Sequence, residues 1–222
     1  MNKFVCIALL VFSGSLVGQT LPEGFVYLHK SAPSIQKELR YLSKNNFIGK
    51  PIQGYQRSNI IVSSEAAKAL KKIQQILLTK GYCLKIFDAY RPQQAVAHFV
   101  RWALVLNDTL MKQQYYPEVS KAALFKQGYI ASKSSHSRGS TIDLTLVSTA
   151  TKKEIDMGST YDFFGIQSHP FYKNISKKQK ENRMLLRNTM LANGFKPFEN
   201  EWWHFTLKKE PFADTYFNFP VH

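Results

Sequence analysis

Two stretches far apart in the chain carry the polar residues that most restrict how it can fold. His136 and Asp143 flank the dipeptide Arg138-Gly139, and a second histidine, His204, lies near the end of the chain. On one regular strand, residues seven positions apart point to opposite faces, because side chains alternate with a period of two. We therefore expect a turn or bulge at Arg138-Gly139 if His136 and Asp143 are to reach one point, and glycine adopts such conformations readily.

These side chains have the composition of a catalytic metal site. Two histidines and an aspartate would supply three ligands to zinc and leave a fourth position for water, while Glu201 lies close to His204 as a candidate base. Each residue taken singly is more often a hydrogen-bonded structural residue than a ligand. The residues alone therefore leave a structural cluster and a zinc site both open.

The surrounding motifs add a family resemblance. The pattern Ser134-x-His136-x-x-Gly139-x-x-x-Asp143 with Glu201-x-x-His204 resembles the zinc peptidases that cut D-alanyl bonds of bacterial cell-wall peptides. Within that group the sequence is most similar to the D-alanyl-D-alanine dipeptidase family. The supporting stretches are Asp88 to Pro92, Gly128 to Ser140, Asp143 to Leu146, Met157 to Ser159, Glu201 to His204 and Tyr216 to Val221. The resemblance runs from about Gly24 to the last residues.

The resemblance implies zinc-dependent hydrolysis of the D-Ala-D-Ala dipeptide to two D-alanines, with one Zn²⁺ per chain. His136, Asp143 and His204 would be the ligands, and Glu201 the general base that takes a proton from metal-activated water and passes it to the leaving amine. Zinc lowers the pKa of its bound water to about 7. Because an offset of three is odd on a strand, we expect Glu201 just before a strand that carries His204.

Three further residues take their expected roles from the resemblance. Arg91 would polarise the scissile carbonyl and stabilise the tetrahedral intermediate, although from the residues alone an ion pair at a helix start is the simpler interpretation. Asp162 would bind the free ammonium of the dipeptide, with a solvated loop acid or cap as the alternative. Ser134 would lie near the substrate, with a turn hydroxyl as the alternative.

Two other functions remain open at this point. A D,D-carboxypeptidase acting on longer peptidoglycan peptides would need an open groove where Asp162 and its loop would otherwise close the site. A non-catalytic, zinc-containing wall-binding module would keep the fold without chemistry. Glu201 and Arg91 argue against the module, because a purely structural metal needs neither a base nor an open coordination position.

The first residues have the order expected of a secretory signal peptide. Lys3 precedes an apolar run from Phe4 to Phe12, and small residues follow up to Gly18. We therefore expect a signal peptide at residues 1–18, a zinc dipeptidase domain at 19–222, and export to the periplasm or cell envelope. A buried first strand or helix is the alternative, and the run is too short for a membrane span, which needs about 20 apolar residues. Cys83 would then be the only cysteine, a core residue without a disulfide.

Charge and length bound the remaining possibilities. The formal net charge is +15, but the lysines are scattered and no nucleic-acid-binding motif accompanies them, so we expect a basic surface and no nucleic-acid partner. A chain of 222 residues fits one domain with a sizeable core.

The pattern of apolar residues predicts an α+β fold, a mostly antiparallel sheet flanked by helices with the zinc site at the sheet. Helices are expected at 36–46, from 63 or 64 to 80, at 93–106 and at 177–193. Strands are expected at 82–87, 129–132 and 141–147, with a closing hairpin at 195–198 and 202–207. Residues 107–127 are expected to form a loop with a short helix.

Overall fold

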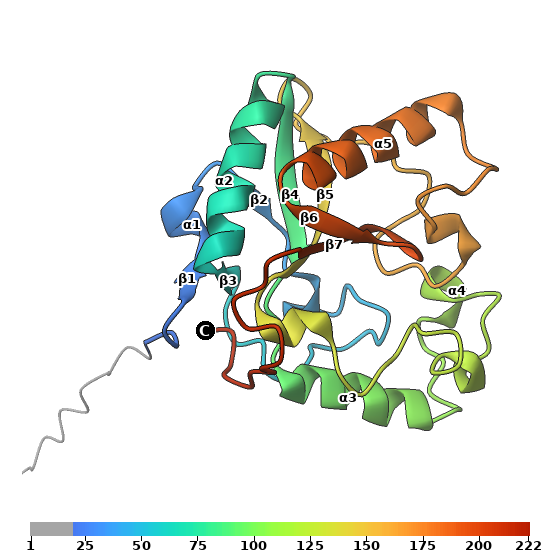
Figure 1. The fold of residues 1–222 in the computed structure, drawn as a ribbon. Coiled ribbons are helices and arrows are strands. Elements are labelled where there is room, and N and C mark those ends of the chain that lie inside the picture. Colours follow the sequence, from blue (N-terminus) through green and yellow to red (C-terminus); the bar gives the residue numbers. More distant parts are fainter. Residues whose placement is uncertain (1–19) are drawn as a thin grey trace, which may run out of the picture.

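A five-stranded sheet forms the centre of the protein (Figure 1). The computed structural model describes residues 20–222, so the expected signal peptide lies outside the described residues. The strand order is β2-β4-β5-β7-β6, and every pair is antiparallel except β2 with β4. The predicted α+β class with a mostly antiparallel sheet is confirmed. The strands are β2 Gln36–Lys37, β4 Tyr82–Asp88, β5 Thr141–Ser148, β6 Phe195–Phe198 and β7 Glu201–Leu207.

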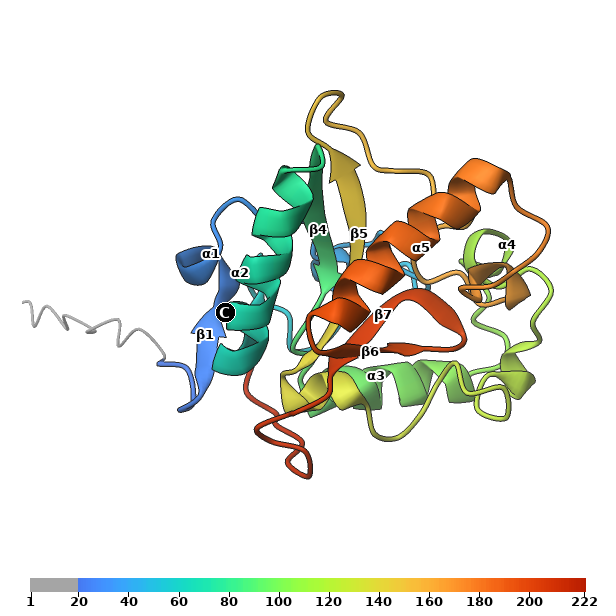
Figure 2. The ribbon, with the colours of Figure 1, turned by 45° about the horizontal axis from the view of Figure 1, so that its top comes forward.

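Helices α2 (Ser64–Leu78) and α5 (Lys177–Ala192) lie against one face of this sheet, and α3 (Gln93–Leu104) lies beyond its end (Figures 1 and 2). Helix α2 begins where the side chain of Ser63 accepts a hydrogen bond from the Ala66 amide, and α5 begins with a capping box. The apolar face of α2 is buried, which anchors the helix on the sheet. The helices are α1 Leu28–Ser31, α2 Ser64–Leu78, α3 Gln93–Leu104, α4 Lys112–Tyr115 and α5 Lys177–Ala192.

A small second sheet and the chain end complete the fold. Strands β1 (Phe25–Tyr27) and β3 (Ile61–Ser63) pair in antiparallel fashion, and neither was predicted. The C-terminal segment returns to this side of the molecule (Figure 1), where the Gln56 amide donates to the Val221 carbonyl. The ring of Phe25 contacts those of Phe212, Phe217 and Phe219. The last residues are thus packed into the domain.

Two predicted elements are wrong. Residues 36–46 form no long helix: they contain β2 and a 3-10 turn, η1, at Arg40–Leu42. The Glu38 amide donates to the Ile86 carbonyl of β4, so pairing at the sheet edge overrides the helical spacing. Residues 129–132 form no strand. Their backbone is irregular, and the Tyr129 ring stacks on Phe164 at 5.0 Å between centroids.

The other predicted helices and strands agree closely with the structure. Helix α3 ends at Leu104, two residues early, and residues 107–127 hold the short helix α4 and a 3-10 turn, η2, at Lys121–Ala123. Cys83 is buried and free, as predicted. No helix within residues 20–222 is long and apolar enough to cross a membrane.

The turn before β5 depends on Gly139. Residues Ser135–Arg138 form a 3-10 turn, η3, which ends at Gly139 with φ of 81°. This confirms the turn expected between His136 and Asp143. A Cβ atom at position 139 would overlap the ring of Phe25.

We predict that Gly139→Ala destabilises the fold by about 2–5 kcal/mol, because left-handed strain and overlap with Phe25 add. Gly128→Ala is the matched control: Gly128 has φ of 79° with no atom within 4 Å of the added Cβ, so only the strain of about 1–2 kcal/mol applies. Urea denaturation of the wild type and both variants measures the free energy of unfolding. Equal losses of unfolding free energy in the two variants would show that overlap with Phe25 adds no cost.

Candidate active site

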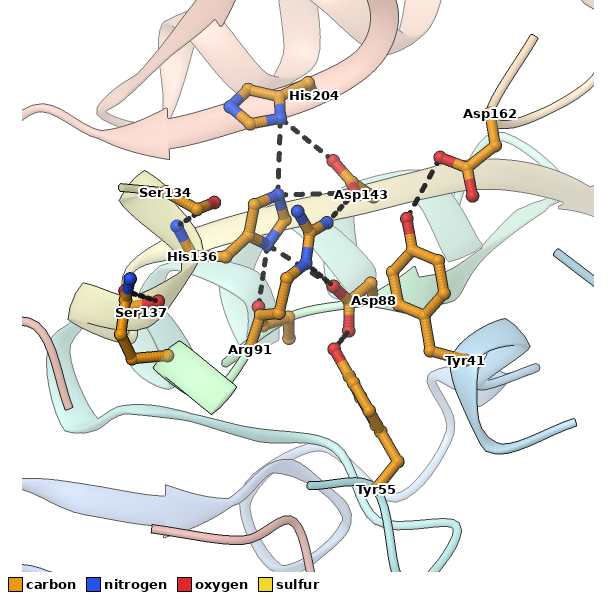
Figure 3. Close-up of polar contacts among 12 residues, drawn as sticks. Tyr41, Tyr55, Asp88, Arg91, Ser134, His136, Ser137, Asp143, Asp162 and His204 are labelled. Atoms are coloured by element: carbon orange, nitrogen blue, oxygen red, sulfur yellow. Dashed lines mark hydrogen bonds and ion pairs between the residues drawn. The ribbon is translucent and has the colours of Figure 1, made fainter. Parts of the chain in front are cut away.

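Three neighbouring strands place acidic and histidine side chains in one row. Asp143 of β5 pairs with Asp88 of β4 on one side and with His204 of β7 on the other. Nδ1 of His204 lies 3.1 Å from Oδ1 of Asp143. The antiparallel register therefore brings together two expected ligands that are far apart in the sequence (Figure 3).

His136 reaches the same point from η3. Its Nε2 atom lies 3.2 Å from Oδ2 of Asp143 and 3.3 Å from Nδ1 of His204. Its Nδ1 atom lies 2.7 Å from the carbonyl oxygen of Ala89, which has only lone pairs to offer, so Nδ1 carries the proton and Nε2 is left as an acceptor. Burial, followed by the charge of Arg91, lowers the pKa of His136 to about 4, so the ring is neutral at pH 7.

The three facing atoms suit a tetrahedral zinc ion. Ligand bonds of about 2.0–2.1 Å at tetrahedral angles separate neighbouring ligand atoms by about 3.3 Å. Nε2 of His136 and Nδ1 of His204 lie 3.3 Å apart, while Oδ1 of Asp143 lies 3.1 Å from His204 and Oδ2 lies 3.2 Å from His136. Oδ1 of Asp143 is buried, yet no group among residues 20–222 donates a hydrogen bond to it. A buried acceptor without a donor, next to a histidine nitrogen, fits a site that holds a cation.

Glu201 lies beside this cluster. It is the first residue of β7, not the residue before the strand as expected, and the pairing of β6 with β7 shifts register next to it. The irregularity lets Glu201 and His204 converge despite their odd spacing, with Oε2 3.5 Å from Nδ1. Burial raises the pKa of Glu201 to about 7, against the opposing charge of His204, and a bound cation would lower it.

Arg91 packs against the cluster with its side chain only 12% exposed, and is not the surface residue of the simpler interpretation. Its Nε donates to Oδ2 of Asp88 at 2.8 Å and its Nη2 to Oδ2 of Asp143 at 3.3 Å. The guanidinium also packs over the rings of Tyr41 and Phe99. Asp88 received no role in the sequence analysis although it begins the Asp88 to Pro92 motif, and its contact shows that it holds Arg91 in place.

Asp162 is joined to the cluster by two tyrosines that the sequence analysis missed. Tyr161 donates to Oδ2 of Asp143 at 3.2 Å, and its hydroxyl lies 3.1 Å from that of Tyr41. Tyr41 donates to Oδ1 of Asp162 at 3.1 Å, while Oδ2 of Asp162 is buried and has no hydrogen-bond partner in the part of the chain that the structure describes. Burial, then the charge of Asp143, raises the pKa of Asp162 well above its usual value.

Ser134 lies on the other side of the cluster from Asp162 (Figure 3). Its hydroxyl accepts a hydrogen bond from the His136 amide at 3.3 Å, which is the turn role given as the alternative. Ser134, Asp162, Arg91 and Glu201 all line one cavity of about 310 Å³ that includes the three candidate ligands. All seven predicted site residues therefore converge at one cavity.

The two tryptophans that precede His204 have a packing role. Trp202 and Trp203 are both buried. Tyr41 and Tyr161 could have been found only through their partners, because a buried tyrosine in an aromatic-rich chain has no distinguishing pattern.

Comparison with known proteins identifies the family. The model of a family described as D-ala-D-ala dipeptidase matches residues 22–222. A D-alanyl-D-alanine dipeptidase of Enterococcus faecalis is 43% identical over 201 residues, covering 90% of this chain and 100% of that protein. Those of Enterococcus faecium and Streptomyces coelicolor are 40% and 38% identical, each covering 89% of this chain and 98% of the relative. The chain therefore belongs to the D-Ala-D-Ala dipeptidase family of zinc metallopeptidases.

Proposed function

We propose that this protein hydrolyses D-Ala-D-Ala to two D-alanines with one zinc ion held by His136, Asp143 and His204. The observation that carries the proposal is the convergence of three ligand atoms within 4.8 Å of one another beside a partly buried glutamate. The family membership and the names of the relatives support the same activity.

The chain's own groups divide the chemistry between them. Bound zinc supplies a Lewis acid and a water of lowered pKa. Glu201 accepts a proton from the attacking water and delivers it to the leaving amine, a role for which a raised pKa is suited. Arg91, held by Asp88, stabilises negative charge on the carbonyl oxygen, and burial of its guanidinium strengthens that interaction.

The two ends of the cavity suit the two ends of a free dipeptide. The unpartnered oxygen of Asp162 is a site for the substrate ammonium, because a buried carboxylate ionises only beside a cation. Ser134 lies across the cluster from Asp162, so a dipeptide whose ammonium binds Asp162 would extend toward it. A longer peptide has an amide in place of the ammonium and would leave Asp162 without a charge partner, which favours dipeptidase over D,D-carboxypeptidase activity. The base and Arg91 disfavour a non-catalytic wall-binding module.

We predict that the protein binds one zinc ion per chain and that His136→Ala weakens zinc binding by more than about a hundredfold, since even outer-shell changes cost about 10–100-fold. Competition with a chelator under native mass spectrometry measures both quantities. His29→Ala, at an exposed histidine, is the control and should bind zinc normally. A second tightly bound zinc, or normal binding by His136→Ala, would contradict the assignment.

We predict that the zinc-loaded protein releases D-alanine from D-Ala-D-Ala and that Glu201→Gln lowers kcat about 10²–10⁴-fold with zinc still bound, because the proton acceptor is lost. Glu199→Gln, at an exposed glutamate two positions earlier, should retain activity.

Three substrates separate the competing functions. D-alanine release is measured from D-Ala-D-Ala, from its N-acetyl derivative and from a longer peptide ending in D-Ala-D-Ala. Cleavage of the free dipeptide alone supports the proposal, while efficient cleavage of the longer peptide would replace it with D,D-carboxypeptidase activity. Absence of release from every substrate, with zinc confirmed, would favour the wall-binding module.

We further propose that residues 1–18 direct export to the periplasm or cell envelope, where the enzyme would salvage dipeptide released from the wall. The support is the order of Lys3, the apolar run and the small residues. We predict that the full chain, expressed in a bacterium, is recovered from the periplasmic or extracellular fraction with the mass of residues 19–222. Recovery of the unprocessed chain from the cytoplasm would contradict export.

A further inference from the structure

A buried arginine on α5 joins the two ends of the loop that carries Asp162. We call residues 157–169 the Asp162 loop. The Nε atom of Arg183 donates to the carbonyl of Met157 at 2.5 Å, at the start of this loop. Its Nη1 and Nη2 atoms donate to the carbonyls of His169 at 2.6 Å and Gln167 at 2.8 Å, at the end of the loop. One guanidinium therefore closes the loop at its base.

No ion pair accounts for the burial of Arg183 within residues 20–222. Its side chain is 1% exposed, and no carboxylate within residues 20–222 lies at ion-pair distance from it. A buried charge is costly unless hydrogen bonds compensate it, and here backbone carbonyls of the Asp162 loop supply them. The loop carbonyls thus accept the hydrogen bonds of the buried guanidinium, and the same bonds fix the two ends of the loop.

The hydroxyl of Ser159 adds a second connection at the same place. It accepts a hydrogen bond from Nη2 of Arg183 at 3.4 Å and one from Nε1 of Trp202, on β7, at 2.9 Å. It also lies 3.3 Å from the hydroxyl of Ser168, near the far end of the loop. The base of the loop is thereby tied both to α5 and to the strand that carries His204.

The tip of the loop needs such support. Asp162 has φ of 62°, a left-handed conformation that non-glycine residues adopt at a cost, and such conformations persist only where the surroundings enforce them. The conformation aims the carboxylate at Tyr41 and the cavity. Next to it, Tyr161 donates to Asp143. The loop thus carries one contact to the proposed amino-end site and one to the metal cluster.

We infer that Arg183 is a positioning residue for substrate selectivity: by closing the base of the Asp162 loop, it holds Asp162 where the ammonium of a free dipeptide binds. This inference rests on the proposed dipeptidase function. Arg183 itself lines no part of the cavity, so its effect on the reaction would pass through the loop.

The test compares Arg183→Met with Arg187→Met. Both replace an arginine of α5 with an apolar side chain, but Arg187 stacks on Phe171 and pairs with Glu199 at 3.6 Å, outside the Asp162 loop. For each variant, zinc content is confirmed, and kcat and KM are measured for D-Ala-D-Ala. N-acetyl-D-Ala-D-Ala, which lacks the ammonium, is measured in parallel as a substrate or, where turnover is undetectable, as a competitive inhibitor.

We predict that Arg183→Met lowers kcat/KM for D-Ala-D-Ala roughly ten- to a hundredfold, mainly through KM, because displacement of a positioning contact by about 1 Å has effects of this size. The kcat/KM of the acetylated dipeptide, or its inhibition constant, should change by less than about twofold. Selectivity for the free amine therefore falls. Arg183→Lys should recover part of the selectivity, since an ammonium also donates to carbonyls. Arg187→Met should match the wild type.

Two other outcomes would contradict these expectations. If Arg183→Met at full zinc content loses kcat/KM or affinity equally for the free and the acetylated dipeptide, Arg183 has a general structural role and the inference is overturned. A wild-type protein inactive on D-Ala-D-Ala would refute the proposed function itself.

If Arg183→Met does not fold, Ser159→Ala, which removes one shared hydroxyl, should shift selectivity in the same direction by a smaller factor. Hydrogen exchange should show faster exchange of amides in residues 157–169 in this variant. Unchanged selectivity in folded Ser159→Ala and Arg183→Lys would overturn the inference.

Discussion

The register of β5 is the constraint on which the site depends. Its pairing with β4 on one side and β7 on the other sets Asp143 between Asp88 and His204, and a slip of one residue would turn Asp143 to the opposite face. Buried Ile142 and Leu144 flank Asp143 and would become misplaced by the same slip. The hydrophobic core therefore enforces the metal geometry, because the residues that make the strand stable also specify its register.

Around the three ligand atoms lies a buried polar network that is satisfied almost throughout. Ala89 orients His136, Asp88 holds Arg91, and Tyr55 donates to Asp88 at 2.8 Å. Low dielectric makes each of these bonds strong and makes an unpaired group costly. The exceptions, one oxygen each on Asp143 and Asp162, lie where we propose that zinc and the substrate ammonium bind.

The sequence predicted most of the scaffold, and its errors have identifiable causes. Helices α2, α3 and α5 and the strands β4, β5, β6 and β7 follow from the spacing of their apolar residues, and α2 and α5 also from serine caps. Residues 36–46 have helical spacing, but a sheet edge at β4 was available for pairing, which no local pattern reveals. Residues 129–132 are rich in apolar side chains because they pack over the cavity, not because they pair.

By itself, the sequence determined which chemistry was available: two histidines, an aspartate and a glutamate around a glycine turn, in motifs shared with one family. Only the tertiary structure decided how those groups are held. Tyr41 and Tyr161 link Asp162 to the cluster, and Arg183 closes a loop from another element. The contacts of Tyr41 with Asp162 and Tyr161 join residues more than a hundred positions apart, and those of Arg183 end on backbone atoms common to all residues; neither kind leaves a local pattern in the chain.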